Sequence, residues 1–206
     1  MRSNRSAAKR SRLTGSVRTS RGASPPSSRV WELNLSSPLH TDRLGHAIGT
    51  ALQGGETLAL YGPLGVGKTA LVRGIAAGLG AASRGVSSPT FVLIHEYRGR
   101  LPLAHIDLYR LNSVREIESI GLEEYLSGST VAAIEWADKG RTILPHDRLE
   151  IELRHQSVQS RSIRLMAIGP LSAALLANTR RSHAHPSKLP LSRRPLSPKP
   201  KRKASS

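Results

Sequence analysis

The chain of 206 residues contains no cysteine and few aromatic residues: two tryptophans, four tyrosines and one phenylalanine. The absence of cysteine excludes disulfide bonds and thiolate metal sites, and it fits a reducing compartment. No apolar run in the sequence approaches the roughly 18 residues that a membrane-spanning helix needs. We therefore expect a cytoplasmic protein without a membrane partner. With so few aromatic side chains, stacking on bases is a weak route to nucleic-acid recognition.

Acidic residues are missing from both ends of the chain. Residues 1–30 hold eight basic side chains and residues 170–206 hold nine, whereas residues 31–169 hold all 14 acidic residues and the other 14 basic ones. The formal net charge of +17 therefore belongs to the ends. Because the ends are rich in serine, proline and basic residues, they cannot bury enough apolar surface to offset the entropy of ordering. We predict a disordered basic extension at 1–30, one domain at 31–169 and a disordered basic tail at 170–206.

The basic ends allow more than one interpretation. The start lacks the apolar middle of a secretory signal; it resembles an organelle transit peptide, and a translation start assigned too far upstream gives the same composition. Basic tails also contact RNA phosphates in a salt-sensitive, sequence-independent way, whereas a solvated extension without a partner is the alternative.

One segment at 62–69, Gly-Pro-Leu-Gly-Val-Gly-Lys-Thr, fits the phosphate-loop pattern G-x-x-x-x-G-K-[ST]. It stands between a predicted buried strand at 57–61 and a predicted helix at 70–79, which is the context that the motif requires. In such a loop, backbone N–H groups turn toward the phosphates of a nucleoside triphosphate, Lys68 meets the β and γ phosphates, and Thr69 offers its hydroxyl to Mg²⁺. The predicted nucleotide-binding residues in and beside the loop are Gly62, Gly65, Val66, Gly67, Lys68, Thr69 and Ala70.

The remaining hydrophobic pattern predicts an α/β fold. It contains a short strand at 31–35, a helix at 41–52, a hairpin of strands at 91–97 and 101–106, a helix opened by the capping box of Ser113 and Glu116, an apolar strand at 130–134, and a second hairpin at 149–153 and 163–167. We expect a P-loop NTPase-like single domain whose mixed sheet has a parallel centre and antiparallel hairpins.

Two predicted strands end in a carboxylate, Asp107 and Glu135. Hydrolysis or transfer of a phosphoryl group needs carboxylates that hold Mg²⁺ and orient the attacking oxygen. Either acid fits the position of a Walker B residue, and two acids near one ion allow divided roles. The alternative is that each is only a polar residue where a strand leaves the core.

Four further blocks accompany the loop: Ser-Pro-Thr at 88–90, His-Ile-Asp-Leu-Tyr-Arg-Leu at 105–111, Ile-Gly-Leu-Glu-Glu-Tyr at 120–125 and Ile-Glu-Trp at 134–136. Together with the loop they resemble the TsaE family, small bacterial ATPases of tRNA threonylcarbamoyladenosine synthesis. The similarity runs from about residue 33 to residue 167. The Asp-Leu-Tyr-Arg-Leu and Glu-Trp elements are more specific than the loop itself.

The resemblance implies roles for single residues. Lys68 and the loop backbone hold ATP, and Thr69 and Glu135 hold Mg²⁺. Asp107 is the acid needed for hydrolysis, so the predicted catalytic residues are Asp107, Lys68 and Glu135. Thr90 lies in a switch-like segment that senses the nucleotide.

Trp136 follows the metal-binding acid, as in relatives where it is linked to function, and we count it with the nucleotide site. Its alternative role is a large apolar side chain packed where the strand emerges. None of the eight histidines stands at a metal-ligand spacing, so no histidine ligand is predicted.

The resemblance implies an accessory ATPase in the formation of threonylcarbamoyladenosine on tRNA, with TsaD and TsaB as partners and tRNA reached through that complex. Hydrolysis by the isolated chain is expected to be slow until a partner docks. One alternative is a small-molecule kinase built on the same loop, although the sequence shows no lid insertion between the strands. Another is a nucleic-acid-binding module in which the basic ends do the binding.

Overall fold

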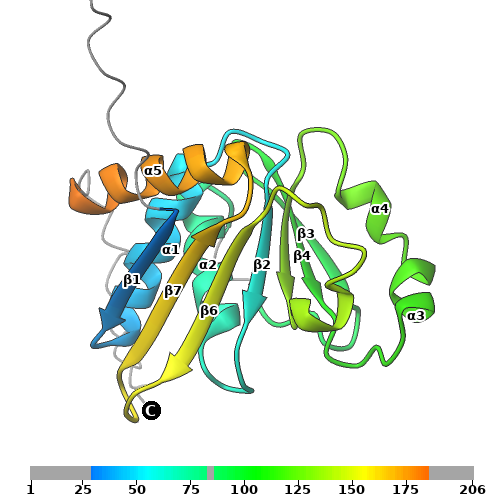
Figure 1. The fold of residues 1–206 in the computed structure, drawn as a ribbon, viewed down its shortest axis with the longest axis horizontal. Helices are drawn as coiled ribbons and strands as arrows, with labels where there is room; N and C mark the ends of the chain where they lie inside the picture. The colour runs from blue at the N-terminus through cyan, green and yellow to red at the C-terminus, as the bar shows by residue number, and fades with distance from the viewer. Residues whose placement is uncertain (1–28, 83–85, 186–206) are drawn as a thin grey trace, which may run out of the picture.

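A computed structural model describes residues 29–82 and 86–185 (Figure 1). Its strands are β1 (Val30–Leu35), β2 (Thr57–Tyr61), β3 (Ile94–Arg98), β4 (Pro102–Asp107), β5 (Val131–Glu135), β6 (Leu149–His155) and β7 (Arg161–Ala167). Its helices are α1 (Pro38–Ala51), α2 (Lys68–Gly78), α3 (Val114–Ser119), α4 (Leu122–Tyr125), the 3₁₀ turn η2 (Ala137–Gly140) and α5 (Pro170–Ala184). Of the predicted disordered ends, 1–30 and 170–206, residues 1–28 and 186–206 lie outside the described residues.

The strands form one sheet in the order β1-β7-β6-β2-β5-β4-β3. The four central strands, β6, β2, β5 and β4, run parallel to their neighbours in this group, whereas β3 pairs antiparallel with β4, and β7 pairs antiparallel with β6 and β1. Both predicted hairpins and the mixed sheet are confirmed. Pro102, which cannot donate a ladder hydrogen bond, is the first residue of β4.

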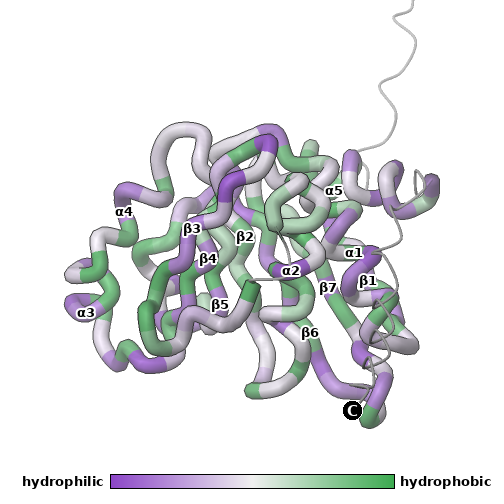
Figure 2. The backbone as a smooth tube through the Cα atoms, turned by 180° about the vertical axis from the view of Figure 1, so that it is seen from behind, coloured by the Kyte–Doolittle hydropathy of each residue, from purple (hydrophilic) through white to green (hydrophobic). Residues whose placement is uncertain are grey.

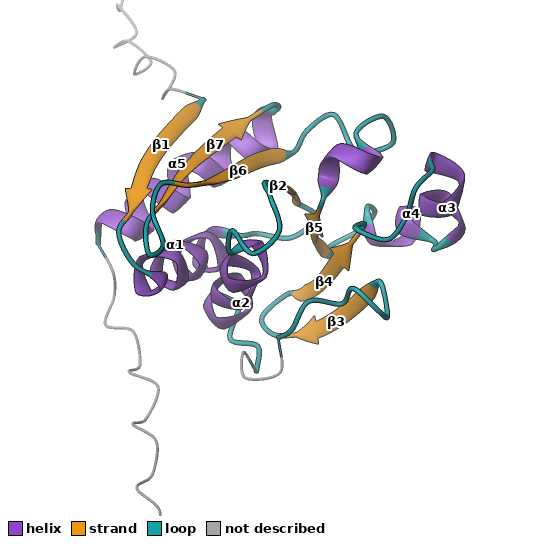
Figure 3. Cartoon of the chain, turned by 90° about the horizontal axis from the view of Figure 1, so that it is seen from below, coloured by secondary structure: helices purple, strands orange, loops and turns teal. Residues whose placement is uncertain are grey.

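Each face of the sheet carries its own hydrophobic core, and together they give three layers (Figure 3). One core joins α1, α2 and α5 to strand side chains such as Leu60 and Ile151. The other core, on the opposite face of the sheet, joins α3, α4 and η2 to strand side chains such as Ile106 and Ile134. Along β6 and β7 hydrophobic and hydrophilic colours alternate in Figure 2, as expected for strands with one buried face.

Helices α1 and α2 pack with almost no side chain between their backbones. A Cβ atom at Gly49 of α1 would lie 2.2 Å from the carbonyl oxygen of Ile75, and one at Gly78 of α2 would lie 2.3 Å from that of His46. Gly45 and Gly74 meet in the same way one turn earlier. Only glycine fits at these contacts, and α1 thereby fixes the position of α2, the helix that the phosphate loop opens.

Helix α5 corrects the predicted domain boundary. The prediction of a disordered tail from residue 170 is wrong for residues 170–184, which form α5, because Leu175 and Leu176 are buried in the core beside α1. Asp147 caps the helix by accepting hydrogen bonds from the backbone N–H groups of Leu171 (2.7 Å) and Ser172 (2.9 Å). Counting charges alone missed this apolar face. Among the described residues, no helix is long and apolar enough to cross a bilayer.

Candidate functional site

The carboxyl ends of the parallel strands meet at one edge of the sheet, where α/β folds bind their ligands. Asp107 at the end of β4 stands directly opposite Glu135 at the end of β5 in the strand register. The phosphate loop leaves the next strand, β2, at the same edge. Two carboxylates and the loop are therefore brought together from segments far apart in the sequence, as the sequence predicted.

Glycine is required at two points of the loop. Gly62 has φ of 135° and passes so close to β6 that a Cβ atom would lie 2.4 Å from the carbonyl oxygen of Leu153. Gly67 has φ of 114° and is the N-cap of α2, which begins at Lys68. These conformations turn the chain sharply between β2 and α2, and they leave the first N–H groups of the helix without intrahelical partners.

Lys68 is bound by its own loop. Its Nζ donates to the carbonyl oxygens of Gly62 (2.7 Å) and Pro63 (3.0 Å) and lies 3.8 Å from the ring centroid of Trp136. Burial lowers the pKa of this ammonium group, and the nearby carboxylates of Glu135 and Asp107 act against that shift. Lys68 is thus a partly desolvated cation that can exchange two carbonyl partners for phosphate oxygens.

Glu135 joins three elements. Its Oε1 accepts a hydrogen bond from Thr69 Oγ1 at 2.7 Å and lies 2.8 Å from His105 Nε2. Because a carboxylate only accepts, His105 donates through Nε2, and its Nδ1 is buried without a partner among the described residues. The fully buried His105 fixes the orientation of Glu135.

Asp107 is held by a short segment that precedes β3. Ser88 Oγ and Thr90 Oγ1 each lie 2.6 Å from its Oδ2, and the backbone N–H of Tyr109 donates to its Oδ1 at 2.9 Å. This segment ends at Leu93, whose φ of 71° is a conformation that side chains other than glycine rarely adopt. Both oxygens of the carboxylate are engaged, and movement of the segment would release Oδ2, whereas the N–H of Tyr109 would remain on Oδ1.

Trp136 lies beside Lys68 and beside Tyr109, which follows Asp107 by two residues. It has φ of 58°, in the left-handed region, immediately after β5. Its ring centroid is 4.9 Å from that of Tyr109, and Lys139 donates hydrogen bonds to the carbonyl oxygens of Tyr109 and Leu111. Strained backbone of this kind persists only where its surroundings hold it, and it gathers at functional sites.

These groups line a cavity of about 350 Å³. Of the predicted site residues, it includes Gly65, Gly67, Lys68, Thr69, Thr90, Asp107, Glu135 and Trp136. Three predicted residues do not line it: Gly62 faces β6, Val66 is fully buried, and Ala70 lies in the first turn of α2.

Sequence reasoning missed three contributors. Ser88 and His105 lie inside blocks that the resemblance singled out, but no spacing rule shows that they bind Asp107 and Glu135. Arg161, the first residue of β7, donates from Nε to the carbonyl oxygen of Val66 at 3.0 Å, and this contact spans 95 positions of sequence. The sequence offered a signal only for His105, which is a histidine in an otherwise apolar strand pattern.

The donor set fits a magnesium ion. Mg²⁺ prefers oxygen ligands and retains several waters, so one hydroxyl and one carboxylate beside a phosphate loop are a common arrangement. Thr69 and Glu135 provide this pair, and their 2.7 Å hydrogen bond shows that both oxygens reach one point. Asp107, one strand away, is left for a separate role.

Comparisons with known proteins agree with this geometry. Residues 35–163 match the family model described as "Threonylcarbamoyl adenosine biosynthesis protein TsaE". A protein of Bacillus subtilis (strain 168) named tRNA threonylcarbamoyladenosine biosynthesis protein TsaE is 40% identical over 134 residues, which are 65% of this chain and 83% of that relative. A protein of the same name from Treponema pallidum is 41% identical over 114 residues, 55% of this chain and 84% of that relative.

The crystal structure of Bacillus subtilis YdiB superimposes with a TM-score of 0.63 and 31% sequence identity, covering 74% of this chain and 95% of that one. The match therefore includes the P-loop NTPase-like sheet as well as the sequence blocks around the cavity. The family model covers well over half of the chain, with the phosphate loop, Asp107, Glu135 and Trp136 inside it. On these grounds the chain belongs to the TsaE family.

Proposed function

We propose that this chain is a Mg²⁺-dependent ATPase that acts as an accessory subunit in the formation of threonylcarbamoyladenosine on tRNA. The observation that carries the proposal is the convergence of the phosphate loop, the Thr69–Glu135 pair and Asp107 on one cavity. The family provides the pathway, since the matching relatives are named for tRNA threonylcarbamoyladenosine biosynthesis.

In this proposal ATP binding exchanges contacts that the chain now makes with itself. Lys68 leaves the carbonyl oxygens of Gly62 and Pro63 for the phosphates, and the loop N–H groups with the N-terminus of α2 stabilise the charge on the leaving phosphate oxygens. Charge on the phosphate oxygens would be neutralised by a bound Mg²⁺. Thr69 and Glu135 would hold it, and His105 keeps Glu135 turned toward Thr69.

Asp107 orients the attacking water in the proposed mechanism. As the structure stands, Ser88 and Thr90 occupy its Oδ2. The carboxylate accepts from water only after at least one hydroxyl moves away, so we propose that the segment carrying Thr90 is the switch. Slow hydrolysis by the isolated chain follows, because a docking partner that moves this segment would release Asp107.

Exposed apolar side chains around the cavity support a protein partner. Leu64 at the tip of the loop is 71% exposed, and Phe91 and Val92 in the Thr90 segment are 83% and 65% exposed. Apolar side chains gathered at a site rim are typical of an interaction surface. We propose TsaD and TsaB as the partners, and that tRNA is reached through their complex in a cytoplasmic setting.

The decisive experiment measures phosphate release by the purified chain with and without purified TsaD and TsaB. We expect stimulation by the partners, and loss of the stimulated rate with Lys68→Ala because ATP binding is weakened. Leu39→Ala in α1, an exposed residue outside the site, is the matched control and keeps the stimulated rate. Partner-independent hydrolysis, or phosphate transfer to a small acceptor without release, would replace this proposal with a free ATPase or a kinase.

A further inference from the structure

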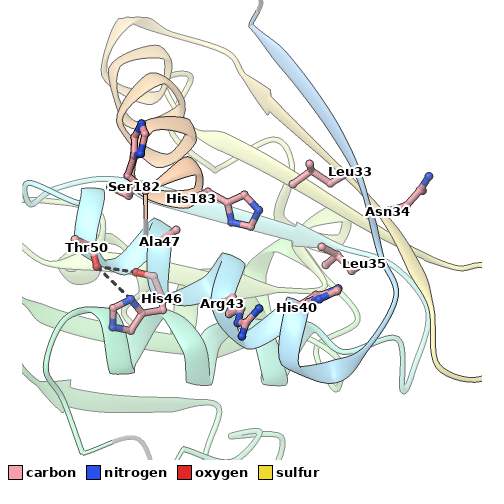
Figure 4. Close-up of a pocket in the computed structure, with 11 residues that line it drawn as sticks. Leu33, Asn34, Leu35, His40, Arg43, His46, Ala47, Thr50, Ser182 and His183 are labelled. Atoms are coloured by element: carbon pink, nitrogen blue, oxygen red, sulfur yellow. Dashed lines mark hydrogen bonds between the residues drawn. The ribbon is translucent and has the colours of Figure 1, made fainter. Parts of the chain in front are cut away.

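The largest cluster of histidines lies away from the nucleotide site, in a hollow of about 390 Å³ between α1, α5 and β1. Its lining includes one arginine and four histidines: Arg43, His40 and His46 from α1, and His183 and His185 from the end of α5. Figure 4 shows His183 reaching from α5 into the space between β1 and α1, with Arg43 and His40 on the opposite side. This hollow shares no lining residue with the cavity beside Lys68.

No carboxylate lines the hollow within the described part of the chain. Asp42, the acid beside Arg43 on α1, has Arg73 of α2 as its charged neighbour. Arg43 is exposed and makes no hydrogen bond or ion pair with a described residue, although its charge reaches His183. The side chains that line this site are thus able to donate to an anion and offer it no repelling charge.

The hollow is not a metal site. Among the described residues, no group of three or more histidine or acidic side chains has the geometry to hold a metal ion. Three of the histidines already have neighbours. His40 Nδ1 lies 3.0 Å from Ser36 Oγ, and His46 Nδ1 lies 3.5 Å from Thr50 Oγ1. The ring of His183 stands edge-on to Trp31 at 5.5 Å. Arginine and histidine without carboxylates instead match the oxygen atoms of a phosphate.

Both basic ends of the chain begin beside this hollow. Val30 opens β1 and His185 caps α5, and Arg180 of α5 donates to the carbonyl oxygen of Val30 at 2.7 Å, so the two junctions are joined. Residues 1–29 carry eight basic side chains and residues 186–206 carry seven, without a single acid. A long run of positive side chains without acids is complementary to a polymer of phosphates rather than to one small anion.

We propose that the hollow formed by α1, α5 and β1 binds the phosphate backbone of an RNA. The recognition is by charge: the ends contain no aromatic side chain on which a base can stack. This goes beyond the proposed ATPase, since it gives the chain its own RNA contact, independent of the nucleotide cavity and of a partner protein.

The binding has a defined dependence on pH. The charged and titratable groups that face the hollow are Arg43, His40 and His46 from α1 and His183 and His185 from α5, with no charged residue from β1 in the lining. Burial lowers the pKa of His46, and burial together with the positive charge of His40 and Arg43 lowers that of His183. A bound phosphate favours protonation, and the lowered pKa values move that protonation below the usual range of histidine, so RNA should bind more tightly as the pH falls from about 7 to about 5.

The test uses the full-length chain and a labelled, unmodified tRNA transcript, with binding measured by fluorescence anisotropy between about 50 and 200 mM salt. We expect Arg43→Gln to weaken binding about fivefold to tenfold near 0.1 M salt and to reduce the slope of log K against log salt by about one. Arg164→Gln is the matched control, because Arg164 is an exposed arginine of β7 that faces Glu32 outside the hollow. It should change binding by less than about twofold.

Two further measurements separate the explanations. His183→Gln should flatten the gain in affinity at low pH, and Lys68→Ala should leave tRNA binding unchanged even if the proposed ATPase fails. Equal losses with Arg43→Gln and Arg164→Gln would overturn the proposal in favour of unspecific charge. Absence of tRNA binding would overturn it as well. Displacement of tRNA by adenosine monophosphate or inorganic phosphate at micromolar concentration would assign the hollow to a free phosphorylated ligand instead.

Discussion

The edge of the sheet that carries the phosphate loop and the layer formed by α1, α2 and α5 are held together in different ways. At the edge, charged and polar side chains hold one another through hydrogen bonds that a ligand can replace: Lys68 to its loop, Thr69 to Glu135, and Thr90 to Asp107. In the helical layer, backbones meet at glycines, and side chains such as Leu44, Ile48 and Ile75 are fully buried. The first region can rearrange without loss of packing, and the second cannot.

This difference separates activity from stability. Substitutions at the edge should change binding and turnover while the folded state persists, because few apolar contacts are lost there. Substitutions between α1 and α2 should destabilise the whole domain, because α2 carries the loop. Leu93 and Trp136, with their positive φ angles, lie on the side that rearranges.

The largest effect is expected at Asp107. Asp107→Asn should lower the partner-stimulated rate of ATP hydrolysis by about a hundredfold or more, because an amide orients and polarises water less well than a carboxylate. ATP affinity and the melting temperature should stay nearly constant, since Ser88 and Thr90 still have an acceptor at this position. Steady-state turnover and the binding of a fluorescent ATP analogue measure the two quantities.

Ser88→Ala is the informative companion to Asp107→Asn. It removes one of the two hydroxyl groups on Oδ2 and should raise hydrolysis by the isolated chain, if release of Asp107 limits the rate. A parallel loss of ATP binding and turnover in Asp107→Asn would remove Asp107 from the catalytic role and make it a structural residue.

The next effect is one of stability, at the contact of α1 with α2. Gly49→Ala should destabilise the domain by on the order of 3 kcal/mol, because the added methyl group meets the Ile75 carbonyl oxygen at 2.2 Å. Helix propensity alone predicts the opposite sign, a gain of about 1 kcal/mol. Urea unfolding decides between them, with Leu39→Ala as an exposed control in the same helix. A more stable Gly49→Ala protein would show that the two backbones can separate.

How far the sequence predicted these regions depends on the range of the contacts. The phosphate loop, the acids at the strand ends and both hairpins are local patterns, and the structure has them at the predicted positions. Helix α5 was missed because the excess of Arg and Lys around it outweighed Leu175 and Leu176 in the composition. The partners of Glu135, Asp107 and Val66 were missed because each contact joins segments that only the folded sheet brings together.

Arg161 tests whether the antiparallel hairpin of β6 and β7 also supports the loop. Its hydrogen bond to the Val66 carbonyl oxygen fixes the orientation of the peptide group between Val66 and Gly67. In a trans peptide the C=O and N–H groups point in opposite directions, so the N–H of Gly67 points away from Arg161. We expect Arg161→Gln to weaken ATP binding about tenfold, the loss typical of one hydrogen bond to a charged group. Arg154→Gln, an exposed arginine of β6 paired with Glu152, is the control.

Chemical rescue distinguishes this positioning role from a general loss of charge. Millimolar guanidinium should restore ATP binding to Arg161→Ala, whereas Arg161→Lys, which keeps the charge but changes the donor geometry, should stay weaker than the natural chain. If lysine restores full affinity and guanidinium does nothing, Arg161 acts only through its charge.

The smallest effect is expected at Asp147, the cap of α5. Burial acts to raise the pKa of this carboxyl group, but the hydrogen bonds from Ser172 and Leu171 outweigh it, so the pKa lies below its usual value. The folded state therefore favours the carboxylate, and its stabilisation is present at neutral pH and disappears as the pH falls below about 4. Asp147→Ala should cost about 1 kcal/mol at pH 7, as for other helix caps.

The pH dependence makes this prediction specific to the cap. The difference in melting temperature between the natural chain and Asp147→Ala should shrink as the pH falls from about 5 to about 3, because the protonated carboxyl group accepts hydrogen bonds less strongly. Leu171→Ala, at an exposed residue of α5 without a titratable side chain, is the control, and its effect should stay constant with pH. A difference that stays constant with pH would mean that α5 is held by Leu175 and Leu176 alone, and the stability of the helical layer would then rest on packing without any contribution from charge.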